Sequence, residues 1–146
     1  MVINSIVEDC SLMVGNYCVS LLEGMEFKSV DDKIILSDKE RKLVIVMEEV
    51  SANFTTLSAN LDLLSTKYIA NGYTDVSCQN KEYNKVPYID IMFLRDGKPG
   101  KTIFLKCNDG SVLSLVMVAE GADELSYGEE YMMGLLREVR NREVIA

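Results

Sequence analysis

The stretch Gly97-Lys98-Pro99-Gly100-Lys101-Thr102 is the first place in the sequence where residue types and spacing suggest chemistry. It is similar to the end of the phosphate-binding motif G-x-x-x-x-G-K-[ST], in which backbone N–H groups surround phosphate oxygens before a helix begins. Arg95 stands where the first glycine belongs, Pro99 removes one N–H donor, and a strand-like run follows Thr102. We therefore predict a hairpin loop over residues 96–100 and no phosphate site.

Side chains suited to catalysis are scarce. The chain contains no histidine, which removes Ser-His-Asp and Cys-His nucleophiles and every histidine metal ligand. Asp90, Glu48 and Glu49 are the strand-borne candidates for two-carboxylate catalysis, but acidic residues at strand ends are usually solvated. The four cysteines form no C-x-x-C pair and are interpreted as buried free thiols. We expect no enzymatic activity, no cofactor and no metal.

Composition and charge indicate one globular domain spanning residues 1–146. Hydrophobic residues make up 48% of the chain and charged residues 26%, which are ordinary globular values. The net charge of −8, without a basic stripe, argues against nucleic acid and acidic lipid as partners. The acidic N-terminus is unlike a signal peptide, and no apolar run approaches a membrane span. We expect a cytoplasmic protein without membrane insertion, or an exported or lipid-anchored one if a signal has been removed.

Apolar runs rich in β-branched residues and bounded by turn signals predict strands. The clearest runs are residues 43–50, 88–94, 102–107 and 111–119, and weaker ones are residues 17–22 and 33–37.

Two helices are predicted from apolar spacing and capping residues. The first starts at Thr55 or Thr56 and ends at Gly72, with a stripe at helical spacing formed by Leu57, Leu61, Leu64 and Tyr68. The second starts at the capping box of Ser126 and Glu129. Residues 1–14 are ambiguous and are expected to form a flexible or helical N-terminal arm.

The predicted hairpin also assigns residues to faces of the sheet. With Arg95 opposite Lys101, alternation gives one wholly apolar face and one mixed face, on which Asp90 lies opposite Lys106. A two-residue turn at Asp109-Gly110 then adds a third strand to the mixed face. One interpretation is that a helix covers each face.

The alternative is that the mixed face stays partly open and binds a protein partner, because methionine and aromatic side chains suit adaptable recognition. The residues predicted to make that contact are Tyr88, Asp90, Met92, Phe104, Lys106, Leu115 and Met117.

The run YCVSLLEGMEF resembles the opening strand and turn of the PsbP-like superfamily, with Leu22 at the family's proline and Met25 at its tryptophan. The helix ending in YIANGY, the strand near Asp75 to Gln79, the meandering strands and a helix after AEGADELSY follow the family's order. Its members include photosystem extrinsic proteins, a Ran-binding import factor and bacterial type VI secretion effector chaperones. The resemblance implies an α+β fold, with a twisted, mainly antiparallel sheet of about six strands between helices, and non-enzymatic protein binding.

A second resemblance is to acidic homodimeric chaperones of type III secretion, which have a similar size and pI. A long helix over residues 2–14 would favour that family, whereas a sheet strand over residues 17–22 would favour the PsbP-like one. A small-ligand carrier or weak hydrolase, with a pocket between sheet and helix, is the third alternative.

Overall fold

Seven antiparallel strands form one continuous sheet in the computed structural model, which describes residues 11–14, 17–20, 26–31, 33–40, 42–83, 85–106 and 112–145. In spatial order, the strands are β3 (Glu26–Val30), β4 (Lys33–Asp38), β5 (Leu43–Val50), β9 (Val112–Ala119), β8 (Lys98–Lys106), β7 (Val86–Arg95) and β6 (Thr74–Tyr83). A separate two-stranded sheet pairs β1 (Ser11–Val14) with β2 (Tyr17–Ser20). The predicted α+β class with a mainly antiparallel sheet is confirmed.

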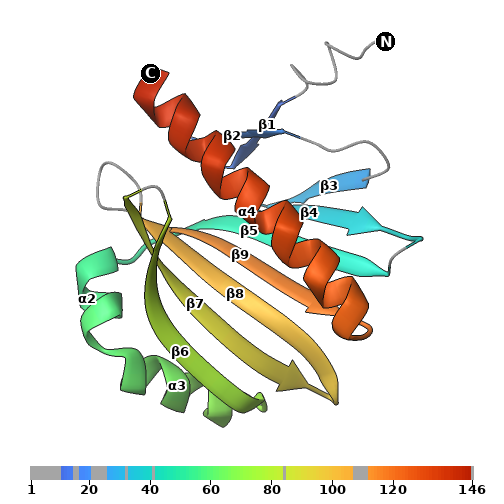
Figure 1. The fold of residues 1–146 in the computed structure, drawn as a ribbon, viewed down its shortest axis with the longest axis vertical. Helices are drawn as coiled ribbons and strands as arrows, with labels where there is room; N and C mark the ends of the chain where they lie inside the picture. The colour runs from blue at the N-terminus through green and yellow to red at the C-terminus, as the bar shows by residue number, and fades with distance from the viewer. Residues whose placement is uncertain are drawn as a thin grey trace.

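Helices pack on both faces of the seven-stranded sheet (Figure 1). The long helix α4 (Ala122–Ile145) crosses one face and contacts β5, β8 and β9, and the small β1–β2 sheet lies beside it. The short helices α2 (Phe54–Ala59) and α3 (Leu61–Ala70) lie on the other face, near β6 and β8. We call these two surfaces the α4 face and the α2–α3 face.

The burial of each strand follows its apolar pattern. In β4, Ile34 and Leu36 are buried while Lys33 is exposed, which is the alternation of a strand covered on one face. In β7 and in the first half of β9, consecutive residues are buried because both faces are covered there, whereas Val116 and Val118 in the second half of β9 are only half-buried. No helix in the described part of the chain is both long and apolar enough to cross a membrane.

The β7–β8 hairpin turns at Asp96-Gly97, so the predicted loop over residues 96–100 is wrong. Asp96 and Gly97 have φ values of 52° and 78°, as a two-residue turn of type I′ requires. Arg95 therefore pairs with Lys98 and not, as predicted, with Lys101. The register therefore shifts by three positions. Because side chains alternate between faces and three is an odd number, every β8 side chain moves to the opposite face.

The register of β8 with β9 also differs from prediction. Lys106 pairs with Val112, whereas a two-residue turn at Asp109-Gly110 would have placed it opposite Leu113; the turn itself lies outside the described residues. The shift here is one position, also an odd number. Each of the two shifts exchanges the faces once, so together they leave Leu115 and Met117 on the face of Met92, as predicted.

The helix predicted over residues 55–72 is interrupted at Asn60. Its start is capped by Asn53, whose side chain accepts a hydrogen bond from the Thr56 backbone N–H at 3.1 Å, in place of the predicted Thr55 or Thr56 cap. Asn60 has φ −129° and ψ 49°, outside the helical region, and it separates α2 from α3. Helix α4 begins at Ala122, one turn before the predicted Ser126.

The N-terminal segment matches neither discriminating expectation in full. Ser11–Val14 is strand β1, which differs from the helical alternative at those positions, while residues 1–10 lie outside the described residues. Tyr17–Ser20 is a strand, but it pairs with β1 and is not part of the seven-stranded sheet. Strand β3 was not predicted, because all of its residues are exposed and give no apolar alternation.

Candidate functional site

The structure separates the seven residues that were predicted to bind a partner. Five of them lie on the α4 face, namely Tyr88, Asp90, Met92, Leu115 and Met117. Phe104 and Lys106 belong to the α2–α3 face, where Phe104 is half-buried and Lys106 is exposed.

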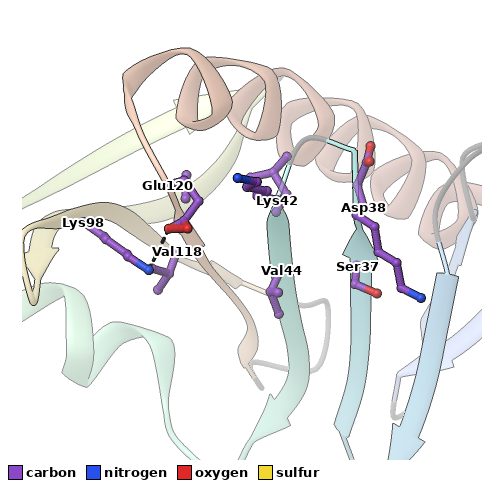
Figure 2. A pocket seen from close by; sticks show the side chains of 10 residues that line it. Ser37, Asp38, Lys42, Val44, Lys98, Val118 and Glu120 are labelled. Carbon is purple, nitrogen blue, oxygen red and sulfur yellow. Dashed lines mark ion pairs between the residues drawn. The ribbon is translucent and has the colours of Figure 1, made fainter.

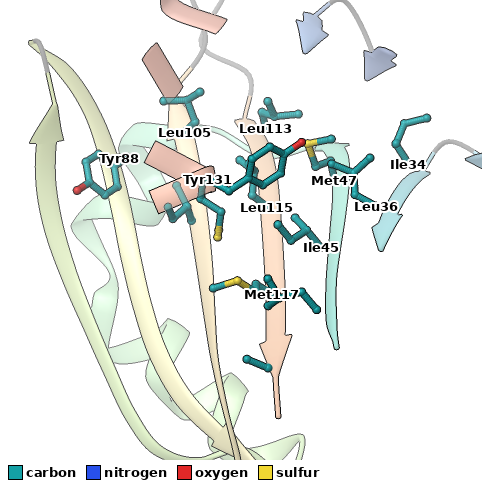
Figure 3. Packing of buried hydrophobic residues seen from close by; sticks show 14 of the residues in the cluster. Ile34, Leu36, Ile45, Met47, Tyr88, Leu105, Leu113, Leu115, Met117 and Tyr131 are labelled. Carbon is teal, nitrogen blue, oxygen red and sulfur yellow. The ribbon is translucent and has the colours of Figure 1, made fainter. Parts of the chain in front are cut away.

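Helix α4 covers the predicted contact surface. Leu115 and Met117 are 1% and 0% exposed, and Tyr131 of α4 lies over them (Figure 3). Tyr88 is buried in the same cluster and Met92 packs against it. These residues form the larger hydrophobic core, so in this structure they do not offer a surface to a partner.

A buried ionic cluster lies beneath the start of α4. Asp90 is opposite Ile103, so the predicted pair with Lys106 is wrong. The Asp90 Oδ2 atom lies 2.8 Å from Lys81 Nζ and 3.2 Å from Lys101 Nζ. Lys101 Nζ also lies 2.7 Å from Glu129 Oε2 on α4. Two lysines and two carboxylates therefore balance their charges between β6, β7, β8 and the helix.

The ionic cluster is better suited to holding α4 than to catalysis. The side chains of Asp90 and Lys101 are only 4% and 9% exposed, and charges this deep are tolerated when they are paired. The hydrogen bond to Asp90 raises the pKa of Lys81 above its ordinary value, with burial opposing. Asp90 Oδ1 has no hydrogen-bond partner. Within the described residues, no group of three or more His, Cys, Asp or Glu side chains could hold a metal ion.

An aromatic cluster fills the half of the α2–α3 face over β6, β7 and β8. The rings of Tyr68, Tyr73 and Phe93 lie with centroids 4.7 to 5.8 Å apart, distances typical of favourable aromatic pairs. The Tyr68 hydroxyl donates to Thr102 Oγ1 at 2.8 Å. Opposite Phe93 stands Gly100, where any Cβ would collide with the Phe93 ring. Glycine at this position lets the Phe93 ring approach the β8 backbone closely.

Cys78 lies on β6 at the edge of this covered half. It is half-buried and unpaired, and it accepts a hydrogen bond from the Ser65 hydroxyl at 3.3 Å. Its position is that of a packed free thiol.

The other half of the α2–α3 face is an apolar surface over β4, β5 and β9. Its residues form two rows that run across the strands, with β5 between β4 and β9. Val44 is 44% exposed, and the others are half-buried. We call this surface the open sheet face; its members are Ile35, Val44, Val46, Val116 and Val118.

Ion pairs flank the open sheet face at opposite ends. Lys33 Nζ lies 3.9 Å from Glu48 Oε1 at one end, and Lys98 Nζ lies 2.7 Å from Glu120 Oε2 at the other. An apolar centre with a charged rim is the composition of many protein interfaces.

A pocket of about 450 Å³ deepens the end of the open sheet face at the β4–β5 turn (Figure 2). Val44 and Val118 belong to its apolar floor, and the lysine side chains around it come from two hairpin ends, Lys39 and Lys42 from the β4–β5 turn and Lys98 from the β7–β8 turn. Its lining residues are Ser37, Asp38, Lys39, Lys42, Leu43, Val44, Lys98, Val118, Ala119 and Glu120.

The apolar alternation in β5 is the sequence signal for the open sheet face. In LVIVMEEV, Leu43, Ile45 and Met47 alternate with Val44 and Val46, and alternation sends the two sets to opposite faces. Both sets are apolar, so the pattern alone does not reveal which one a helix covers. The pairing of β5 with β9 supplies that information, and it joins segments far apart in the sequence.

No family model matches this chain, and no curated protein sequence matches it. Function is therefore inferred from the geometry of the chain itself.

Proposed function

We propose that the protein is a non-enzymatic protein-binding module, adaptor or chaperone-like in character, that binds its partner through the open sheet face. The observation that carries this proposal is the uneven cover of the α2–α3 face. Val44 is 44% exposed in an apolar surface whose edge, at Val118, packs against the buried cluster beneath α2 and α3. Contiguous exposed apolar surface marks interaction sites in soluble proteins.

The shape and chemistry of the open sheet face favour a protein over a small molecule. Two rows of β-branched side chains across three strands make a broad surface, with the ion pairs Lys33–Glu48 and Lys98–Glu120 at its ends. Apolar cores with polar rims are found in protein interfaces, whereas small ligands are usually enclosed in a cleft. The PsbP-like resemblance supports the same functional class.

Site-specific photo-crosslinking tests this proposal. A benzoyl-phenylalanine placed at Val44 is expected to form an adduct with a discrete protein when the native host cells are irradiated. The matched control places the same group at Ile69, which is 60% exposed on α3 and outside the open sheet face. Equal adducts at both positions would contradict the proposal.

The partner identified in this way is then purified for a direct binding measurement. Val44→Glu is expected to weaken its binding at least tenfold, because a carboxylate would be desolvated against apolar surface. Ile69→Glu introduces the same charge and is expected to leave the affinity unchanged. An adduct of two copies of this chain would instead favour a homodimeric chaperone, and a co-purified small molecule in native mass spectrometry would favour a carrier.

A further inference from the structure

The pocket at the end of the open sheet face has the chemistry to select one kind of partner segment. We propose that it binds an extended peptide segment with an acidic end and an aliphatic remainder, and that Lys42 and Lys98 recognise the carboxylates. This inference rests on the proposed function, because it names the chemistry of the segment that reaches the open sheet face.

Positive charge gathers around this pocket although the chain as a whole carries −8. Three lysines line it, Lys39, Lys42 and Lys98, together with one exposed carboxylate, Glu120. Asp38 is buried and its carboxylate points away from Lys98 (Figure 2). Local charge of this sign complements an acidic segment and gives specificity and a faster encounter.

The lysines differ in how far their charge is already balanced. Lys98 is paired with Glu120 at 2.7 Å, and Lys39 Nζ lies 3.7 Å from Glu26 Oε2 outside the pocket. Lys42 forms no ion pair with any described residue, so it is the ammonium group with the most to gain from a ligand carboxylate.

Glu120 is itself a carboxylate that the lysines at this end of the pocket stabilise. The hydrogen bond from Lys98 lowers the pKa of Glu120, and the charge of Lys42 acts in the same direction. Both ammonium groups thus stabilise negative charge at one location. A ligand carboxylate beside Glu120 would meet the same two lysines, with Lys42 as its main partner.

The pocket floor explains why the segment is aliphatic beyond its acidic end. Val44 and Val118 line the pocket and also form one row of the open sheet face. A chain leaving the pocket therefore passes directly over Val46 and Val116, the next row. Side chains on one side of an extended segment recur about every 6.6 Å, so alternate aliphatic residues would contact successive rows.

Fluorescence anisotropy with three labelled, C-terminally amidated peptides tests the inference. The probes are Asp-Glu-Val-Gly-Val-Gly-Val, its Asn-Gln counterpart and its Lys-Lys counterpart. We expect the acidic probe to bind at least tenfold more tightly than the Asn-Gln probe at low salt, with the difference shrinking as salt screens the charges. The Lys-Lys probe is expected to bind most weakly.

Charge-reversal variants locate the preference. The double variant Lys42→Glu/Lys98→Glu should abolish the advantage of the acidic probe. Lys67→Glu/Lys85→Glu is the matched control, because both lysines are exposed and lie on α3 and at the β6–β7 turn. Equal binding of the acidic and Asn-Gln probes, or equal losses in the two double variants, would overturn the inference.

An uncharged substitution separates this inference from the proposed function. Val44→Asn should weaken the acidic and the Asn-Gln probes alike if the open sheet face is the binding surface. A result in which Val44→Asn weakens both probes, while charge makes no difference, would overturn only the acidic preference. If no probe binds, the inference is likewise overturned, and the crosslinking at Val44 still decides the proposed function.

Discussion

The two faces of one sheet differ in how completely helices cover them. On the α4 face, Ile45, Leu115 and Met117 are 0 to 1% exposed. On the α2–α3 face, Val44 and Val116 alternate with these same residues along β5 and β9, yet they remain partly exposed. Strand composition is similar on both sides. The cover that each face receives therefore determines which one is core and which one is surface.

Helix length explains the difference in cover. At 1.5 Å per residue, the 24 residues of α4 extend about 36 Å, enough to cross seven strands spaced about 4.8 Å apart. Helix α3 has 10 residues, about 15 Å, and the non-helical Asn60 separates it from α2. Two short helices can cover only part of their face, and the aromatic cluster anchors them over β6 to β8.

Removing charge from the buried ionic cluster should have the largest effect on stability. Lys101→Met leaves Asp90 and Glu129 without their shared ammonium group, and loss of one partner of a buried pair costs about 3–5 kcal/mol. Urea unfolding followed by circular dichroism measures this. Lys98→Met, on the same strand but in an exposed pair, is the control and should leave the unfolding midpoint unchanged. Equal midpoints for the two variants would show that the cluster does not hold α4.

Close approach of α4 to the sheet should depend on Gly128. A Cβ at this position would collide with the Met117 side chain and approach Leu43. Gly128→Val should therefore destabilise the fold by about 1–3 kcal/mol through overpacking. Thermal unfolding measures the change, and Ser126→Ala, at an exposed position on the same helix, should be nearly neutral. A neutral Gly128→Val variant would indicate that the helix lies further from the sheet.

Tyr68→Phe, in the covered half of the α2–α3 face, should lower the free energy of unfolding by about 1 kcal/mol, because the buried Thr102 hydroxyl loses its hydrogen-bond partner. Burial raises the pKa of Tyr68 above its ordinary value of 10.0, although the Thr102 hydrogen bond lowers it. The folded state therefore holds this proton more tightly. The contribution of protonated Tyr68 to the free energy of unfolding is complete below pH 10.0 and declines as the pH rises through the folded-state pKa.

The pH dependence provides its own control. Urea unfolding of the wild type at several alkaline pH values should show a loss of stability that Tyr68→Phe reduces. Parallel pH profiles for the two proteins would contradict the assignment.

Alanine substitutions at neighbouring residues of β5 should differ sharply in their effect on stability, and one of them should have the smallest effect of all. Val44→Ala should change the unfolding free energy by about 0.5 kcal/mol or less, as at other surface sites. Ile45→Ala, one residue further along and fully buried, should cost about 2–5 kcal/mol. If Val44→Ala were as costly as Ile45→Ala, the open sheet face would be core and unsuited to a partner.

The sequence allowed local elements to be predicted more accurately than their pairing. The strand over residues 43–50 has the predicted bounds, because a β-branched run between turn signals is a local property. The loop over residues 96–100 was wrong because Pro99 and Gly100 have turn-forming character, yet both lie in β8. Pro99 is tolerated near the strand end, and Gly100 is there to accommodate Phe93.

The candidate site could not be predicted for a related reason. Choosing between the faces required knowledge of where α4 packs, and both faces of β9 are apolar. The contact between Asp90 and Lys101 could not be predicted either, because it depends on the strand register that the hairpin turn sets.

The pairing of β5 with β9 has a consequence for how the molecule assembles. Strands β3 to β5 pair in sequence order, as do β6 to β9, so each group needs only short loop closures. The seam between β5 and β9 joins distant parts of the chain, and closing it carries the larger entropic cost. Val44 and Val46 lie on one side of this seam and Val116 and Val118 on the other. The surface that we propose for the partner thus comes into existence only when the two halves of the polypeptide have joined, and an incompletely folded chain would not display it.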